Sequence, residues 1–213
     1  IDAREHTQFV SKVGGIGAGG IGVGFGVGIV NNNTPVTAFI GSGASISAGL
    51  EDTTGAISLD AQLHVDFDLT SFVGTGGGTA LGAAVAIINE ESDVKTYVVG
   101  SPQTQIKQGA ALKIKAEKDV IVEALTPNVS IGGISAGAAI AKVDASGDTL
   151  AYIGDNSKIG KASGATIGDV SVVADANYDI EVDAWGVSAG MAVGLTANVG
   201  LVDITADVQA QIG

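Results

Sequence analysis

The chain has 213 residues, of which 46% are apolar, but only 4% are aromatic and 33 are glycine. Globular enzymes of this length fill their core with Leu, Phe and Trp, whereas Ala, Val, Ile and Gly dominate here, which favours thin, regular β-layers. The formal charge of −13 argues against nucleic acid as a partner, and anionic membranes would repel the chain on average. The absence of cysteine excludes a disulfide framework and thiolate metal sites.

The N-terminal segment "IDAREHTQFV" has neither the basic region nor the apolar region of a signal peptide. It begins with Ile1, inside a strand-like pattern, and the sequence ends at Gly213, inside a recurring element. We therefore expect a segment of a longer repeat array, in which a missing signal peptide indicates nothing about the compartment.

Residues 14–33 read "GGIGAGGIGVGFGVGIVNNN", and from Gly20 to Ile29 glycine alternates with bulky apolar residues. This alternation predicts a strand with one apolar face and one face of bare backbone. Residues 13–30 carry no charge, and a membrane-spanning strand needs only about 9–11 residues. The glycine face, however, suits close packing against another layer. Membrane insertion after a conformational change is the alternative.

The same segment contains GxGxxG spacings, for instance Gly15, Gly17 and Gly20. A dinucleotide-binding loop is followed by a helix, but here the strand-like alternation continues to Ile29. Later versions of this segment also replace glycine with alanine, which a phosphate-binding loop would not tolerate. The sequence therefore argues against a nucleotide site.

Four related elements recur along the chain: "AFIG", "YVVG", "AYIG" and "AQIG", which end at glycines 41, 100, 154 and 213. Each follows a run of small residues, and the first three runs end in a polar turn. Ala61, Ala116 and Ala174 also align between units. These recurring features predict repeat units of about 57 residues. The approximate boundaries are 14–73, 74–130, 131–186 and, for a partial unit, 187–213.

Within the units the apolar pattern has a period of two, as in residues 57–69. Residues 107–120 contain helix-forming residues, but Leu112, Ile114 and Ala116 fall on one strand face. Repeated short strands joined by Gly, Asn, Asp and Ser turns predict an all-β solenoid, with a right-handed parallel β-helix favoured. Three rungs of about 19 residues would fill one unit. A stacked β-sandwich or hairpin array is the alternative.

Catalytic and metal-binding patterns are not recognisable in the sequence. His6 and His64 are the only histidines, and His64 is expected to point outward between Leu63 and Val65. No Ser, His and Asp residues recur in a triad-like arrangement, so we expect no enzyme activity and no cofactor. The acidic clusters lack the spacing of known calcium loops, so solvated turns account for them and structural calcium is a minor alternative.

The stretches "GAAVAIINEESDVKTYVVG" and "GAAIAKVDASGDTLAYIGDNSKI", followed by "GDVSVVADANYDIEVDAWGVSAG", resemble the repeat region of large bacterial type V-secreted exoproteins. These are the filamentous-haemagglutinin-type adhesins and the fusobacterial leukotoxin-like proteins. The resemblance covers essentially the whole chain, although the first unit has Gly in place of Ala and the second has "YVVGSP" in place of "YIGD". It implies a right-handed β-helix, secreted or attached to the outer membrane of a Gram-negative cell. It brings no catalytic residues.

The leading functional hypothesis is therefore a structural and adhesive stalk that binds a host protein or glycan and stacks on neighbouring repeats of its own chain. The alternative is a segment of a pore-forming or leukotoxin-like toxin that acts on host membranes. A repeat-bearing enzyme such as a polysaccharide lyase would need a cluster of charged groups on one face, and the acids are scattered. The residues expected in exposed contact turns are Asn31, Asn32, Asn33, Thr34, Glu90, Glu91, Asp93, Ser146 and Asp148.

Overall fold

The computed structural model describes residues 1–50, 53–160 and 166–213 and is all-β, with no helix in these ranges. The predicted fold class is therefore confirmed at this level, including strand structure throughout residues 107–120. The strands are β1 (Asp2–Asn32), β2 (Val36–Ile40), β3 (Ser45–Ser47), β4 (Gly49–Leu50), β5 (Thr53–Thr54), β6 (Ala56–Glu90), β7 (Val94–Val98), β8 (Gln105–Ile153), β9 (Lys158–Ile159) and β10 (Ile167–Ile212).

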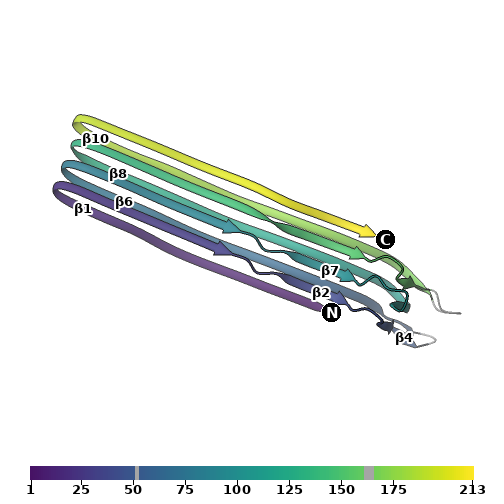
Figure 1. Ribbon diagram of the computed structural model, residues 1–213. Coiled ribbons are helices and arrows are strands. Elements are labelled where there is room, and N and C mark those ends of the chain that lie inside the picture. The colour runs from purple at the N-terminus through teal and green to yellow at the C-terminus, as the bar shows by residue number, and fades with distance from the viewer. Residues whose placement is uncertain (51–52, 161–165) are drawn as a thin grey trace.

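The long strands pair in parallel, each with the strand one coil further along the chain (Figure 1). Asp2 pairs with Asp60, and Ala61 pairs with Ala116. The chain therefore returns to the same position once per repeat interval, so the expectation of three rungs within each unit is wrong. The hairpin array is also not formed, because only β4 and β5 pair antiparallel among the described residues.

The register confirms part of the sequence alignment and corrects another part. Ala61, Ala116 and Ala174 share one position, as expected. One apolar residue of each recurring element also shares one position: Ile40, Val98, Ile153 and Ile212. Gly41 directly follows Ile40, whereas Val99 separates Gly100 from Val98. Gly41 and Gly100 therefore do not share a position, and the second element contains one extra residue.

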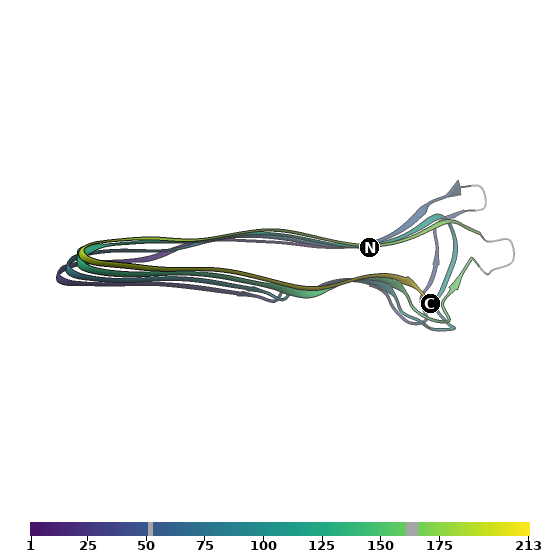
Figure 2. The same ribbon diagram turned by 90° about the horizontal axis from the view of Figure 1, so that it is seen from above.

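Each long strand reverses direction at a turn that contains glycine, which gives the coil two arms in two facing layers (Figure 2). The outgoing arms run to this glycine turn and the return arms run back from it. Gly19 and Gly77 have φ values of 147° and 156°, a conformation that favours glycine. A Cβ on Gly77 would also overlap the carbonyl oxygen of Gly19 in the adjacent coil. The glycines therefore allow successive turns to stack.

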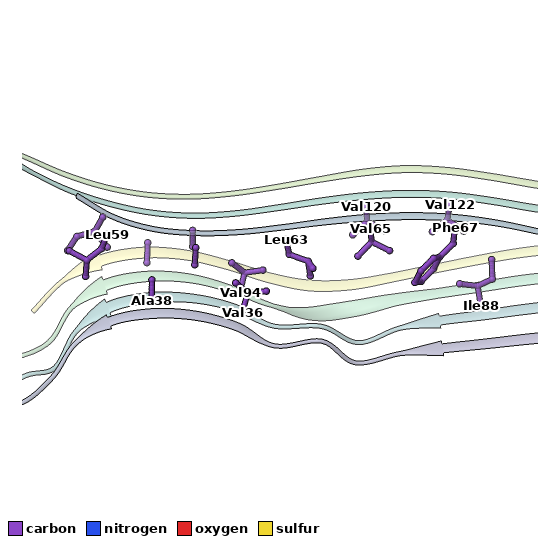
Figure 3. Close-up of a cluster of buried hydrophobic side chains, with 14 of the residues drawn as sticks. Val36, Ala38, Leu59, Leu63, Val65, Phe67, Ile88, Val94, Val120 and Val122 are labelled. Atoms are coloured by element: carbon purple, nitrogen blue, oxygen red, sulfur yellow. The ribbon is translucent and has the colours of Figure 1, made fainter. Parts of the chain in front are cut away.

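The apolar core lies between the two layers (Figure 3). Leu59, Leu63, Val65 and Phe67 alternate along the outgoing arm of β6 and are at most 2% exposed. Figure 3 shows them facing side chains of the return arms, which include Val36, Ile88 and Val94. The strict alternation of residues 57–69 in the sequence is thus the alternation between core and outer surface.

The glycine face of residues 20–29 points inward, as the sequence predicts. Gly22, Gly24, Gly26 and Gly28 are buried, and the bulky residues between them lie outside. A Cβ on Gly24 would lie 2.9 Å from Thr75 Cγ2, and a Cβ on Gly26 would lie 2.8 Å from the carbonyl oxygen of Phe72. The backbone and side chains of the opposite arm fill the space here, so the return arm has no room for an inward side chain.

We expect Gly24→Val and Gly26→Val to lower the free energy of unfolding by about 1–3 kcal/mol each, because the new side chains must displace the opposite layer. Chemical denaturation measures this change. Gly20→Ala is the matched control, since a Cβ on Gly20 would have no atom within 4 Å. An unchanged midpoint in the two valine variants would contradict the packing described here.

Candidate interaction surfaces

A polar bend interrupts the return arms, between β1 and β2, between β6 and β7, and near Gly147 in β8. Gly147 has a φ of 96°, in the left-handed region that favours glycine. The turn residues expected from the sequence come together here, since Asn31 pairs with Asn89, and Val36, Val94 and Thr149 share one position. Exposed among the nine predicted residues are Asn31, Asn33 and Glu91; half-buried are Asn32, Thr34, Asp93, Ser146 and Asp148.

Glu90 is the exception, because its side chain is fully buried and is not available as a contact residue. Its carboxylate lies 2.7 Å from the Nζ of Lys118, whose side chain is equally buried. Lys118 also donates hydrogen bonds to the carbonyl oxygens of Ser92 at 2.8 Å and Ser146 at 2.6 Å. The expectation of an exposed Glu90 was wrong because the strand continues to this residue and places it on the inner face.

Lys118 links the two layers and two successive coils at the bend. It stands on the inner face of an outgoing arm in β8, while its partners Glu90, Ser92 and Ser146 belong to return arms. Glu90 additionally accepts a hydrogen bond from the backbone N–H of Ser92 at 3.0 Å. A buried charge is tolerated only when it is paired and hydrogen-bonded; Lys118 and Glu90 Oε1 meet that condition, whereas Glu90 Oε2 makes only the ion pair. The only signal in the sequence is a lysine at a position where the alternation expects an apolar residue.

We expect Lys118→Met to destabilise the protein by about 3–5 kcal/mol, because it leaves the Glu90 carboxylate buried without a counter-charge. Adding Glu90→Gln to this variant should restore part of the loss, since no lone charge then remains. Lys115→Met, on the exposed face of the same arm, is the control and should change stability by about 1 kcal/mol or less. Denaturant midpoints compare these three variants with the wild type. Equal effects of Lys118→Met and Lys115→Met would contradict a stabilising role for the buried Lys118–Glu90 pair.

A second carboxylate, Asp93, fixes the surface side of the bend. Burial alone would raise the pKa of Asp93, but hydrogen bonds from Lys95 and from the backbone N–H of Asp148 outweigh burial and lower this pKa. The distances to these donors are 2.7 Å and 2.8 Å. Asp93 thus ties the bend of the second coil to that of the third, so its carboxylate supports the turn as well as lining its surface.

Tyr178 extends the buried cluster toward β10. The Nζ of Lys118 lies 5.5 Å from the centre of the Tyr178 ring, and no described group hydrogen-bonds the Tyr178 hydroxyl. Burial, together with the nearby negative charge of Glu90, raises the pKa of Tyr178 to about 12. The folded protein therefore favours the neutral phenol.

Because the folded pKa of Tyr178 exceeds the unfolded value of about 10, its contribution to stability is fully present below pH 10. This contribution is lost as the pH rises from about 10 through 12. We expect the free energy of unfolding of Tyr178→Phe to decrease less than that of the wild type over this pH range. Chemical denaturation at several pH values measures the difference. Parallel curves for the two proteins would show that the phenol is not perturbed.

A second polar row crosses the outer face of the outgoing arms. His64 points outward, as predicted; its ring stacks on that of His6 at 4.7 Å, and its Nδ1 lies 2.8 Å from a carboxylate oxygen of Asp119. Asn177 donates to the other oxygen of Asp119 at 2.9 Å. A shallow hollow of about 430 Å³ lies beside this row. The described residues include no group of three His, Asp or Glu side chains placed to hold a metal ion.

The end of the molecule at the glycine turns is free of charge in every coil. We call it the uncharged end and define it as residues 13–30, 69–89, 124–141 and 184–202, which contain no Asp, Glu, Lys, Arg or His. Each stretch is a continuous uncharged run in the sequence. The register brings all four side by side, so that they form one continuous region on both layers.

Burial is inverted at the uncharged end. Ser71, Thr126, Asn128 and Ser130 point inward and are fully buried. Asn128 bridges the two layers, since its Nδ2 donates to the carbonyl oxygen of Ala138 on the return arm at 3.0 Å. The outer faces instead carry large apolar side chains that are 40–95% exposed: Ile16, Ile21, Val23, Phe25, Val27, Ile29, Phe72, Leu81, Ile131, Ile134, Trp185, Val187, Met191, Val193, Leu195, Val199 and Leu201.

No helix long and apolar enough to cross a membrane occurs within the described ranges. Neither protein-family models, nor curated proteins, nor solved structures give a match to this chain.

Proposed function

We propose that this chain is a stalk segment of a large secreted or surface-attached bacterial exoprotein, in which it extends a β-solenoid and mediates attachment. The finer fold proposed with it is a right-handed solenoid in which one coil corresponds to one repeat unit. The observation that carries this proposal is the parallel stacking of equivalent positions in consecutive coils, over the full length of both arms.

Side chains at equivalent positions of adjacent coils also contact one another along the stack, as expected for a solenoid. Tyr97 stacks on Phe39 at 5.4 Å and on Tyr152 at 5.0 Å. Asn89 donates to Asn31 at 2.6 Å, and the His6–His64 pair adds a further row. Such ladders give each coil contacts only with its neighbours, which is the organisation that permits extension by addition of coils.

The polar bend supports the attachment role. Asn31, Asn33 and Glu91 lie exposed on adjacent coils, while Lys118 and Asp93 hold the turns beneath them. A host protein or glycan would meet amide and carboxylate groups at fixed spacing along the stack. Rigid display of this kind reduces the entropy lost on binding.

The test is binding of the fluorescently labelled chain to host epithelial cells, measured by flow cytometry. We expect binding by the wild type and a loss of about tenfold or more when Asn31, Asn33 and Glu91 are changed to Ala together. The matched control changes Asp2, Gln8 and Lys12, which are exposed polar residues on the outgoing arm of β1, to Ala. Equal binding by both triple variants, or none by the wild type, would refute attachment through the bend.

A second candidate function, a toxin segment that damages host membranes, is favoured by the exposed apolar faces of the uncharged end. It requires that the chain release dye trapped in vesicles, whereas a stalk leaves them sealed.

A further inference from the structure

We infer that the uncharged end is a lipid-contacting surface that enters the hydrocarbon of a neutral phosphatidylcholine bilayer. This adds a partner that the attachment role does not require, and it does not depend on contact through the bend.

The first argument is the inversion of burial within one molecule. In the charged half, Leu63, Val65 and Phe67 are buried, while Asp66 and Asp68 between and beyond them face outward. At the uncharged end the buried groups are mainly Ser, Thr, Asn, Gly and Ala, with larger residues such as Leu69 and Val73 buried only at some positions, and the outward groups include Ile, Val, Leu and Phe. Water favours the first arrangement and hydrocarbon favours the second. The two halves are therefore matched to two different solvents.

The second argument is the depth of the uncharged end, which is similar on both layers. On the outgoing arm of β6 it extends from the last charge at Asp68 to the turn at Gly78. On the return arm it extends from Gly78 to the next charge at Glu90. Arms of roughly 7–12 residues, at about 3.3 Å per residue, span about 23–40 Å, which brackets the bilayer hydrocarbon thickness of about 30 Å.

The third argument is the arrangement of residues at the boundary. Phe72 and Trp185 are 40% and 47% exposed and lie just beyond Asp68 and Asp183, on the side of the turn. Aromatic side chains favour such a level, between hydrocarbon and headgroups. Lys142, on the return arm, pairs with Asp144 at 2.5 Å, on the side away from the turn. The charges begin where the headgroups would lie.

A second copy of the chain is the competing occupant, but the distribution of apolar groups favours lipid. A dimer would cover one outer face, whereas here both outer faces and the turn itself are apolar, with Ile21 72% and Met191 95% exposed. Lipid surrounds an inserted end on all these sides. The net charge of −13 lies outside the uncharged end and disfavours anionic lipid, which selects a neutral bilayer.

The backbone sets one condition on insertion. The outer edges of β1 and β10 have no strand partner among the described residues, and unpaired backbone groups are costly in hydrocarbon. The parallel register allows β10 of one copy to pair with β1 of the next. Insertion therefore requires these edges to be paired, by adjoining coils of a longer chain or by another copy.

The test uses Trp185, the only tryptophan, as a probe of depth. With phosphatidylcholine vesicles we expect its emission to shift to the blue, and lipids brominated near the headgroup to quench it more than lipids brominated deep in the chain. Vesicles rich in phosphatidylserine should bind less protein. An unchanged emission spectrum at high lipid concentration would overturn the inference.

Val27→Asp places a charge among the exposed apolar residues and should weaken vesicle binding by about a hundredfold. Thr37→Asp is the matched control, since Thr37 is exposed on the same outer face beyond the bend, and it should bind within about twofold of wild type. Far-UV circular dichroism and denaturant midpoints check that both variants fold.

Two outcomes would contradict lipid as the occupant. Equal vesicle binding by Val27→Asp and Thr37→Asp would show that the apolar face is not in contact with hydrocarbon. A change in sedimentation of Val27→Asp without lipid, at unaltered vesicle affinity, would assign the face to a second copy. The variant with Ala at Asn31, Asn33 and Glu91 should retain vesicle binding, which separates this inference from attachment through the bend.

Discussion

Parallel backbone pairing at a nearly constant offset is the constraint on which the rest of this structure depends. Once Asp2 pairs with Asp60 and Ala61 with Ala116, each later position is stacked on its equivalent in the next coil. The inner face, the outer face and the turn then become continuous rows that run across the stack. A row of alanines, histidines or uncharged residues acquires a structural meaning that no single coil possesses, because each coil alone leaves its apolar face uncovered.

The constraint also explains why the buried charges are placed where they are. The bend in the return arm directs the carbonyl groups of Ser92 and Ser146 inward, where water is absent. Lys118 from the opposite layer satisfies both, and Glu90 balances its charge. A flat return arm would need neither residue. The ion pair thus stabilises a deviation from regular strand geometry, and that deviation presents Asn31, Asn33 and Glu91 at the surface.

The two ends of the slab obey opposite rules of burial, although one fold builds both. In the charged half, large apolar side chains such as Phe67 fill the space between the layers. Toward the glycine turns, the layers approach so closely that mainly Gly, Ala, Ser, Thr and Asn lie between them, and large residues such as Phe25 lie on the outside. The close approach therefore has a direct surface consequence, and the exposed apolar region follows from the packing beneath it.

The sequence by itself determined the strand content, the alternation of residues 57–69, the inward glycine face and the outward direction of His64. These are local properties, set by side-chain periods of two and by the conformational freedom of glycine. The length of one coil, the burial of Glu90 by Lys118 and the union of four uncharged stretches into one end were decided by the tertiary structure alone. Each depends on which residues of adjacent coils lie side by side, or on which residues face one another across the layers, and strand periodicity contains neither relation.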